Sequence, residues 1–139
     1  MTKIDDHIYI GNDEDYKQAK SKGIQAILNV ARDTHYPQPD GVEYQHIPLT
    51  DDEKNDFKMI NDAADALANF VQQGKKTLVH CRAGVSRSPS VAALYYYLHA
   101  GWPSVHSALD AIKDKRPIVQ PTEGMWQSTL LCAMQGANR

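Results

Sequence analysis

The chain has 139 residues, of which 42% are hydrophobic and 23% charged, and its formal net charge is −2. This length suits one compact domain that buries a core without disulfide staples, so we expect a single domain over residues 1–139. The near-balanced charge, with no basic block, argues against nucleic acid as a partner. No apolar run is long enough for a membrane span, and the start of the chain lacks the apolar core of a signal peptide. The two cysteines are too few for a disulfide framework and suit a reducing compartment, so we expect a cytoplasmic protein. We also expect a monomer that does not bind membranes.

Short apolar runs and segments of helical periodicity alternate along the chain. We expect strands near Ile4 and at 7–10, 24–30, 42–47 and 77–80. We expect helices at 13–22, from Phe57 to Gly74, at 87–100, from Ser104 to Arg116, and after Thr122. Strands that alternate with helices in this way predict an α/β layered domain with a largely parallel sheet.

Two of the expected helices carry apolar residues along one face, which is typical of a helix that packs on a core. These residues are Phe57, Ile60, Ala64, Leu67 and Val71 in one helix, and Val105, Ala108, Leu109 and Ile112 in the next but one. The last helix carries Met125, Trp126, Leu130, Leu131 and Met134. Cys132 lies among apolar residues and is expected in the core. The histidines show no metal-ligand spacing, so we expect no bound metal.

The stretch 78–90 reads Leu-Val-His-Cys-Arg-Ala-Gly-Val-Ser-Arg-Ser-Pro-Ser and places a strand, a tight loop and a helix start in succession. Backbone N–H groups in such a loop form a cradle for an anion. A thiolate at Cys81 would be a nucleophile, and Arg87 could bind two oxygens of the same anion. The pattern therefore indicates phosphoryl transfer through a cysteine. The alternative is a structural cysteine beside an ordinary strand–helix turn, which would leave His80, Gly84 and the serines around Arg87 unexplained.

The pattern His80-Cys81-x5-Arg87-Ser88 resembles the signature of the cysteine-dependent protein tyrosine phosphatases, and residues 83–89 are most similar to the dual-specificity branch. The resemblance implies a three-layer domain with a mixed, mostly parallel sheet of about four or five strands flanked by helices. It also implies a cysteinyl-phosphate on Cys81, no cofactor, and a phosphate-binding loop. The residues of that loop are Arg82, Ala83, Gly84, Val85, Ser86 and Arg87.

The leaving oxygen of a phosphomonoester needs a proton, so a general acid is required. The resemblance places this acid in a loop roughly thirty residues before the cysteine, where residues 48–56 include several carboxylates. Asp51 fits best, and its neighbour Asp52 is the competing candidate. Asp56 is better explained as the N-cap of the helix that follows. Without the cysteine motif, this loop would read as a solvated acidic turn.

The first and last residues of the motif have supporting roles in this interpretation. Ser88 could donate a hydrogen bond to the sulfur and ease its departure, which the resemblance favours. It could also be an ordinary serine in the first turn of a helix. His80 could orient the loop and support the thiolate, although a purely structural role for its ring is equally consistent with the sequence.

Two arginines outside the motif are candidates for binding a second anion. Arg32 and His35 follow a strand that we expect in the sheet, so both could lie at the edge where ligands bind. A solvated loop charge is the alternative. Arg116 resembles an arginine that binds a second anion in some family members, and otherwise caps the C-terminus of its helix.

The favoured function is therefore a phosphatase that acts on phosphotyrosine, phosphoserine and phosphothreonine in proteins. The short chain has no insert that would wall off a deep pocket, and a shallow site would admit the shorter side chains. Phosphoinositides and RNA 5′-phosphates are alternative substrates because the core chemistry is the same. A non-catalytic phosphate-binding module is the third possibility, but such modules typically lose the cysteine, the arginine or the acid.

Overall fold

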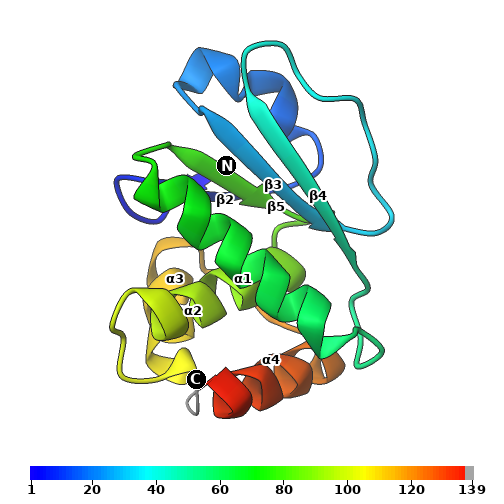
Figure 1. Ribbon diagram of the computed structural model, residues 1–139, viewed down its shortest axis with the longest axis vertical. Coiled ribbons are helices and arrows are strands. Elements are labelled where there is room, and N and C mark those ends of the chain that lie inside the picture. The colour runs from blue at the N-terminus through cyan, green and yellow to red at the C-terminus, as the bar shows by residue number, and fades with distance from the viewer. Residues whose placement is uncertain (137–139) are drawn as a thin grey trace.

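The structure is a computed structural model that describes residues 1–136. It contains a five-stranded sheet with the strand order β1-β2-β5-β3-β4. The strands are β1 (Thr2–Lys3), β2 (Ile8–Gly11), β3 (Ala26–Ala31), β4 (Glu43–Leu49) and β5 (Thr77–His80). β1 is antiparallel to β2, and all the other neighbouring pairs are parallel. Because β5 is the central strand, the residues that follow it leave the sheet in the middle of its carboxyl edge (Figure 1).

The α-helices gather on one face of the sheet, below it in Figure 1. They are α1 (Phe57–Gln72), α2 (Arg87–His99), α3 (Val105–Lys115) and α4 (Glu123–Gly136). α1 and α2 pack directly on the strands, and α3 and α4 pack on α2. The expected mostly parallel α/β domain is confirmed. None of the helices within residues 1–136 is long and apolar enough to cross a membrane.

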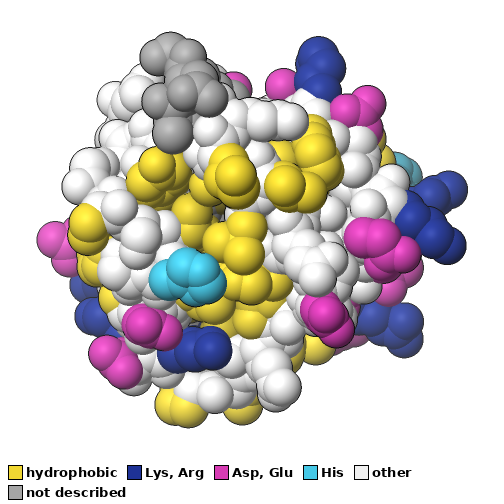
Figure 2. All heavy atoms as spheres, turned by 90° about the horizontal axis from the view of Figure 1, so that it is seen from below, with side chains coloured by type: hydrophobic (Ala, Val, Ile, Leu, Met, Phe, Trp, Pro, Cys, Tyr) yellow, Lys and Arg dark blue, Asp and Glu magenta, His cyan; other side chains and the backbone are white. Residues whose placement is uncertain are grey.

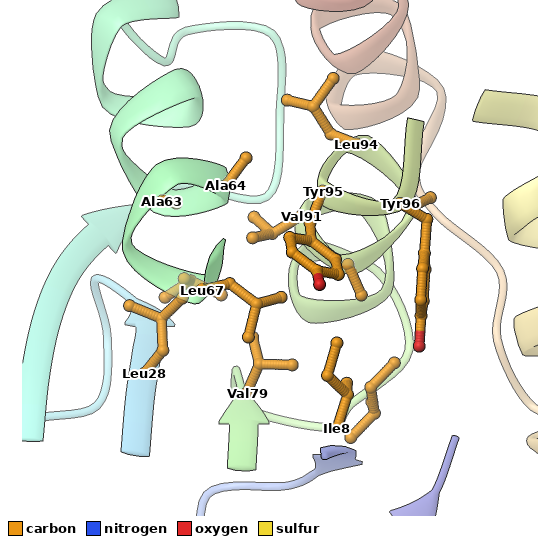
Figure 3. Packing of buried hydrophobic residues seen from close by; sticks show 14 of the residues in the cluster. Ile8, Leu28, Ala63, Ala64, Leu67, Val79, Val91, Leu94, Tyr95 and Tyr96 are labelled. Atoms are coloured by element: carbon orange, nitrogen blue, oxygen red, sulfur yellow. The ribbon is translucent and has the colours of Figure 1, made fainter. Parts of the chain in front are cut away.

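The main core lies between the sheet and the first two helices. Leu28 and Val79 from the strands meet Leu67 of α1, and Val91 of α2 packs beside them (Figure 3). Each of these four side chains is fully buried. All residues of α2 from Arg87 to Tyr96 are buried, because the sheet, α1, α3 and α4 surround the helix. The start of α2 is therefore held rigidly, and this start forms one wall of the site described below.

A smaller cluster covers the opposite face of the sheet. It joins Ile27 and Leu78 of the strands to Ala19, Ile24 and Val42. A helix was predicted over 13–22, but the chain forms two short 3-10 helices, η1 (Asp15–Gln18) and η2 (Lys20–Lys22). The predicted single α-helix was wrong: Asn12 and Asp15 cap the start of the segment, but the turns that follow close with bonds between residues three apart, as in Ala19 to Tyr16.

The strand predicted at 42–47 extends two residues further, to Leu49, and includes Pro48. A proline lacks the N–H that a central strand would need, but β4 is an edge strand and tolerates it. The extra residues matter for the site, because they carry the chain to the carboxyl edge of the sheet. The acidic loop therefore begins there, at Thr50.

The apolar faces predicted for α1 and α3 pack on the core as expected, and Cys132 is fully buried. On α4, however, Leu131 and Met134 are 45% and 68% exposed. The core-facing side of this helix instead carries small residues as well as Met125, which allows a close approach to its neighbours. An apolar hollow of about 490 Å³ lies between α4 and the start of α3, where Leu130 and Val105 line it. On the face seen from below in Figure 2, hydrophobic side chains gather around such a depression.

Candidate active site

The last residue of β5, His80, is followed by a loop over 81–86 that leads directly into α2 at Arg87. Gly84 has a φ of +70°, and a Cβ on it would lie 2.6 Å from the carbonyl oxygen of Gly11. Only glycine therefore fits where the loop turns back against the end of β2. The turn closes a pocket of about 470 Å³. Its lining consists of Asp33, Asp51, Cys81, Arg82, Ala83, Val85, Ser86, Arg87, Gln120 and Thr122.

The backbone of this loop has unused hydrogen-bond donors. Among the hydrogen bonds within residues 1–136, none has a backbone N–H of residues 82–87 as its donor. By contrast, carbonyl oxygens of the same loop are taken: that of Arg82 accepts from Asp13, and that of Val85 accepts from Gln120. A curved run of free N–H groups at the start of a helix is a binding site for an anion.

Cys81 lies at the base of the pocket with only 2% of its surface exposed. Its Sγ is 3.3 Å from the hydroxyl oxygen of Ser88, which is fully buried in the first turn of α2. The pocket thus brings the sulfur together with a hydroxyl and with loop residues whose backbone N–H groups are free. Both kinds of group can donate a hydrogen bond.

Arg87 is buried and held from one side. Its Nη1 donates to the carboxylate of Asp33 at 2.8 Å and to the carbonyl oxygen of Leu49 at 2.9 Å. Its Nε is buried and has no hydrogen-bond partner among residues 1–136. The guanidinium is therefore anchored through one nitrogen, while the edge that contains Nε is free to bind two oxygens of an anion. The hydrogen bond from Arg87 also lowers the pKa of Asp33, so this carboxylate stays charged.

His80 is fully buried behind the loop. Its Nδ1 lies 3.0 Å from the carbonyl oxygen of Cys81, and its Nε2 lies 2.5 Å from the hydroxyl of Tyr36. A carbonyl can only accept, so Nδ1 carries a proton and the neutral ring accepts from Tyr36 at Nε2. Burial lowers the pKa of His80 and raises that of Tyr36. The histidine therefore orients the cysteine backbone as a neutral group.

This burial predicts a pH dependence of stability. The unfolded chain binds a proton at His80 below about pH 6.5, whereas the folded protein resists it, so the free energy of unfolding falls as the pH drops below that value. This loss is at most about 1.4 kcal/mol for each pH unit, down to the pKa that His80 has in the folded protein. We expect His80→Gln to remove it. Urea unfolding at several pH values between 7 and 5 measures it. His7→Gln, at an exposed histidine, is the matched control; equal slopes for wild type and His80→Gln would contradict the prediction.

The acidic loop brings Asp51, and not Asp52, to the pocket. One carboxylate oxygen of Asp51 accepts hydrogen bonds from the hydroxyls of Ser86 and Thr122. The carboxylate of Asp52 instead accepts from Thr50 and from the backbone N–H of Lys54, which fixes the shape of the loop. These hydrogen bonds hold the pKa of Asp52 below its usual range. The structure thus places Asp51, and not Asp52, at the pocket, whereas the sequence left both as candidates for the acid.

Comparison with known proteins identifies the family of this chain. Residues 8–135 match the family model described as the dual specificity phosphatase, catalytic domain. The chain belongs to the dual-specificity phosphatase family. This confirms the resemblance seen in the sequence.

Individual relatives are similar over most of this chain. Protein phosphatase Slingshot homolog 2 of Homo sapiens is 30% identical over 99% of this chain, and Protein phosphatase Slingshot of Drosophila melanogaster is 34% identical over 88% of it. The alignments cover only 10% and 12% of those two proteins, so the chain spans about a tenth of their length. Dual specificity phosphatase 28 of Homo sapiens is 31% identical over 79% of this chain and 62% of that protein. The crystal structure of human DUSP28 has a TM-score of 0.88 at 25% identity, covering 99% of both chains.

The arginines considered for a second anion differ in their placement. Arg32 lines a hollow of about 420 Å³ next to the pocket at Cys81, and the two share Asp33, Asp51 and Arg87. Arg116 lies outside both linings. Its guanidinium donates to the carbonyl oxygens of Gly84 and Ala83 and to the hydroxyl of Thr2. Arg116 therefore braces the loop that follows β5.

Of the other expected site residues, His35 lies near His46, with tilted rings whose centroids are 5.6 Å apart, and is absent from the lining of either hollow. Sequence reasoning also missed four contributors: Asp33, Tyr36, Gln120 and Thr122. Asp33 stands beside the arginine that drew attention to this loop, but its contact with Arg87 crosses 54 positions of the chain. Thr122 was noted only as a helix boundary. Neither carries a local signal, because both act through residues that are distant in sequence.

Proposed function

We propose that this phosphatase-family chain hydrolyses phosphomonoesters on protein side chains through a cysteinyl-phosphate. The Cys81 thiolate attacks phosphorus, the bond from phosphorus to the ester oxygen breaks, and protonated Asp51 gives its proton to that oxygen. Water then attacks the phosphocysteine, the sulfur–phosphorus bond breaks, and the proton from water returns to Asp51. Ser88 donates to the departing sulfur. One observation carries the proposal: Cys81 and Arg87 line the same pocket as loop residues whose backbone N–H groups are free, and the Nε of Arg87 is also unpartnered among residues 1–136.

These groups match the charge that develops in the reaction. The transition state of phosphoryl transfer spreads negative charge over its equatorial oxygens. Fixed donors aimed at that charge need no rearrangement during the reaction, and such preorganised electrostatics is usually the largest contribution to catalysis. The anchoring of Arg87 by Asp33 and Leu49 supplies this fixation.

The substrates proposed are phosphotyrosine, phosphoserine and phosphothreonine. The catalytic pocket adjoins the hollow at Arg32, so it is open on that side and does not require a long side chain to reach Cys81. Relatives named as protein phosphatases match most of the chain. We propose Arg32 as the contact for a second anionic group on the substrate, because it lines the adjoining hollow and forms no ion pair among residues 1–136.

The test is phosphate release from one peptide sequence carrying phosphotyrosine, phosphoserine or phosphothreonine, compared with a phosphoinositide and a 5′-phosphorylated RNA. We expect the wild type to turn over all three peptides. For a doubly phosphorylated peptide, we expect Arg32→Ala to have a higher KM than the wild type. Turnover of only the phosphoinositide or only the RNA would contradict phosphoproteins as the substrate class. Failure on every substrate, including a generic aryl phosphate, would indicate a non-catalytic phosphate-binding module.

A further inference from the structure

Thr122, the residue before α4, connects three parts of the site. Its backbone N–H donates to the hydroxyl oxygen of Ser86 in the phosphate-binding loop at 2.9 Å. Its own hydroxyl lies 3.1 Å from a carboxylate oxygen of Asp51, to which it donates. The same hydroxyl accepts from the backbone N–H of Met125 at 3.3 Å, as an N-cap does. One residue thus joins the acid and the helix start through its side chain, and the phosphate-binding loop through its backbone.

The helix start approaches the acidic loop closely at a second point. A Cβ on Gly124 would lie 2.7 Å from the backbone nitrogen of Glu53 and 3.0 Å from the carbonyl carbon of Asp52. Such contacts are too short for any side chain, so the loop backbone lies directly against the first turn of α4. The loop is also braced internally, because the side-chain amide of Asn55 bonds both the N–H and the carbonyl oxygen of Thr50.

We propose that Thr122 is a positioning residue for the general acid, and that α4 holds the acidic loop in its working place before substrate arrives. This inference rests on the proposed function, since it assigns Asp51 the role of acid. A hydroxyl that donates to one oxygen of Asp51 leaves the other oxygen to carry the proton toward the ester oxygen. Thr122 touches the acid and not the reacting atoms. Its effect should therefore be confined to steps in which Asp51 transfers a proton.

Leaving-group dependence separates positioning from a general loss of structure. Phenyl phosphate needs protonation of its leaving oxygen, whereas 4-nitrophenyl phosphate releases a much more stable anion. Since general acid catalysis contributes about 10²–10⁴-fold, we expect Thr122→Val to lose roughly tenfold or more in kcat/KM on phenyl phosphate. The loss on 4-nitrophenyl phosphate should be several-fold smaller. Thr122→Ser keeps the hydroxyl and should restore both values.

Ser104→Ala is the matched control, because Ser104 caps α3 in the same way through the N–H of Ser107 but lies outside the pocket lining. Ser104→Ala should change kcat/KM only slightly, and to the same extent on both substrates. An equal loss on the two substrates in Thr122→Val, or no loss at all, would overturn the proposal. Failure of the wild type to hydrolyse either substrate would instead overturn the proposed function, so the two failures are distinguishable.

Discussion

Replacing Cys81 with serine is expected to lower turnover of aryl phosphates by roughly 10⁴-fold or more, as loss of a nucleophile does in other enzymes with covalent intermediates. A serine hydroxyl is far less acidic than a thiol, so the hydrogen-bond donors of this loop cannot generate an alkoxide at neutral pH. The cradle itself should survive, because the free N–H groups belong to the backbone and Arg87 is anchored by Asp33 and Leu49.

The expected result therefore has two parts, loss of turnover and retention of binding. Release of the phenol measures the first, and calorimetric titration of the variant with a phosphopeptide measures the second. Cys132→Ala is the matched control, because Cys132 is also buried but lies in α4 outside the pocket lining. It should keep the activity of the wild type. Undiminished turnover in Cys81→Ser would exclude the cysteinyl-phosphate mechanism.

The part of the site that the sequence predicts well is the part that is local. Cys81, Ser86 and Arg87 lie within one loop and the first residue of a helix, so their spacing alone places them around a common point. The strand before the loop and the amphipathic faces of α1 and α3 are likewise visible, because each repeats at the period of its own element. Periodicity does not describe α2, which is buried on nearly all sides and has no polar face to reveal its orientation.

What the sequence does not show is set by the order of the strands. Asp33 reaches Arg87 because β3 lies next to β5, so the residues after both strands meet at one edge. Thr122 reaches Asp51 across 71 positions because α4 begins beside the acidic loop. Arg116 could be recognised as a basic residue at the end of a helix, but its bonds to loop carbonyls depend on the path of the backbone. Such contacts follow from topology and have no local pattern.

Asp51→Asn is expected to lower kcat on phenyl phosphate by roughly 10²–10³-fold, within the range that general acid catalysis contributes. Asparagine keeps the shape of the side chain and can still accept from Ser86 and Thr122, but it has no proton to give. Asp52→Asn is the matched control because it makes the same chemical change one residue away. The carboxylate of Asp52 bonds Thr50 and the N–H of Lys54 within its own loop, so its loss should change kcat by only a few-fold.

The same pair of variants tests whether proton transfer is the function that is lost. On 4-nitrophenyl phosphate, whose leaving group needs little protonation, the deficit of Asp51→Asn in kcat/KM should shrink markedly, while Asp52→Asn should behave alike on both substrates. Steady-state kinetics at the pH optimum of the wild type gives both comparisons. A larger deficit for Asp52→Asn would move the acid by one residue. An equal deficit of Asp51→Asn on both substrates would show that Asp51 supports the loop and does not supply the proton, because only a proton donor depends on the leaving group.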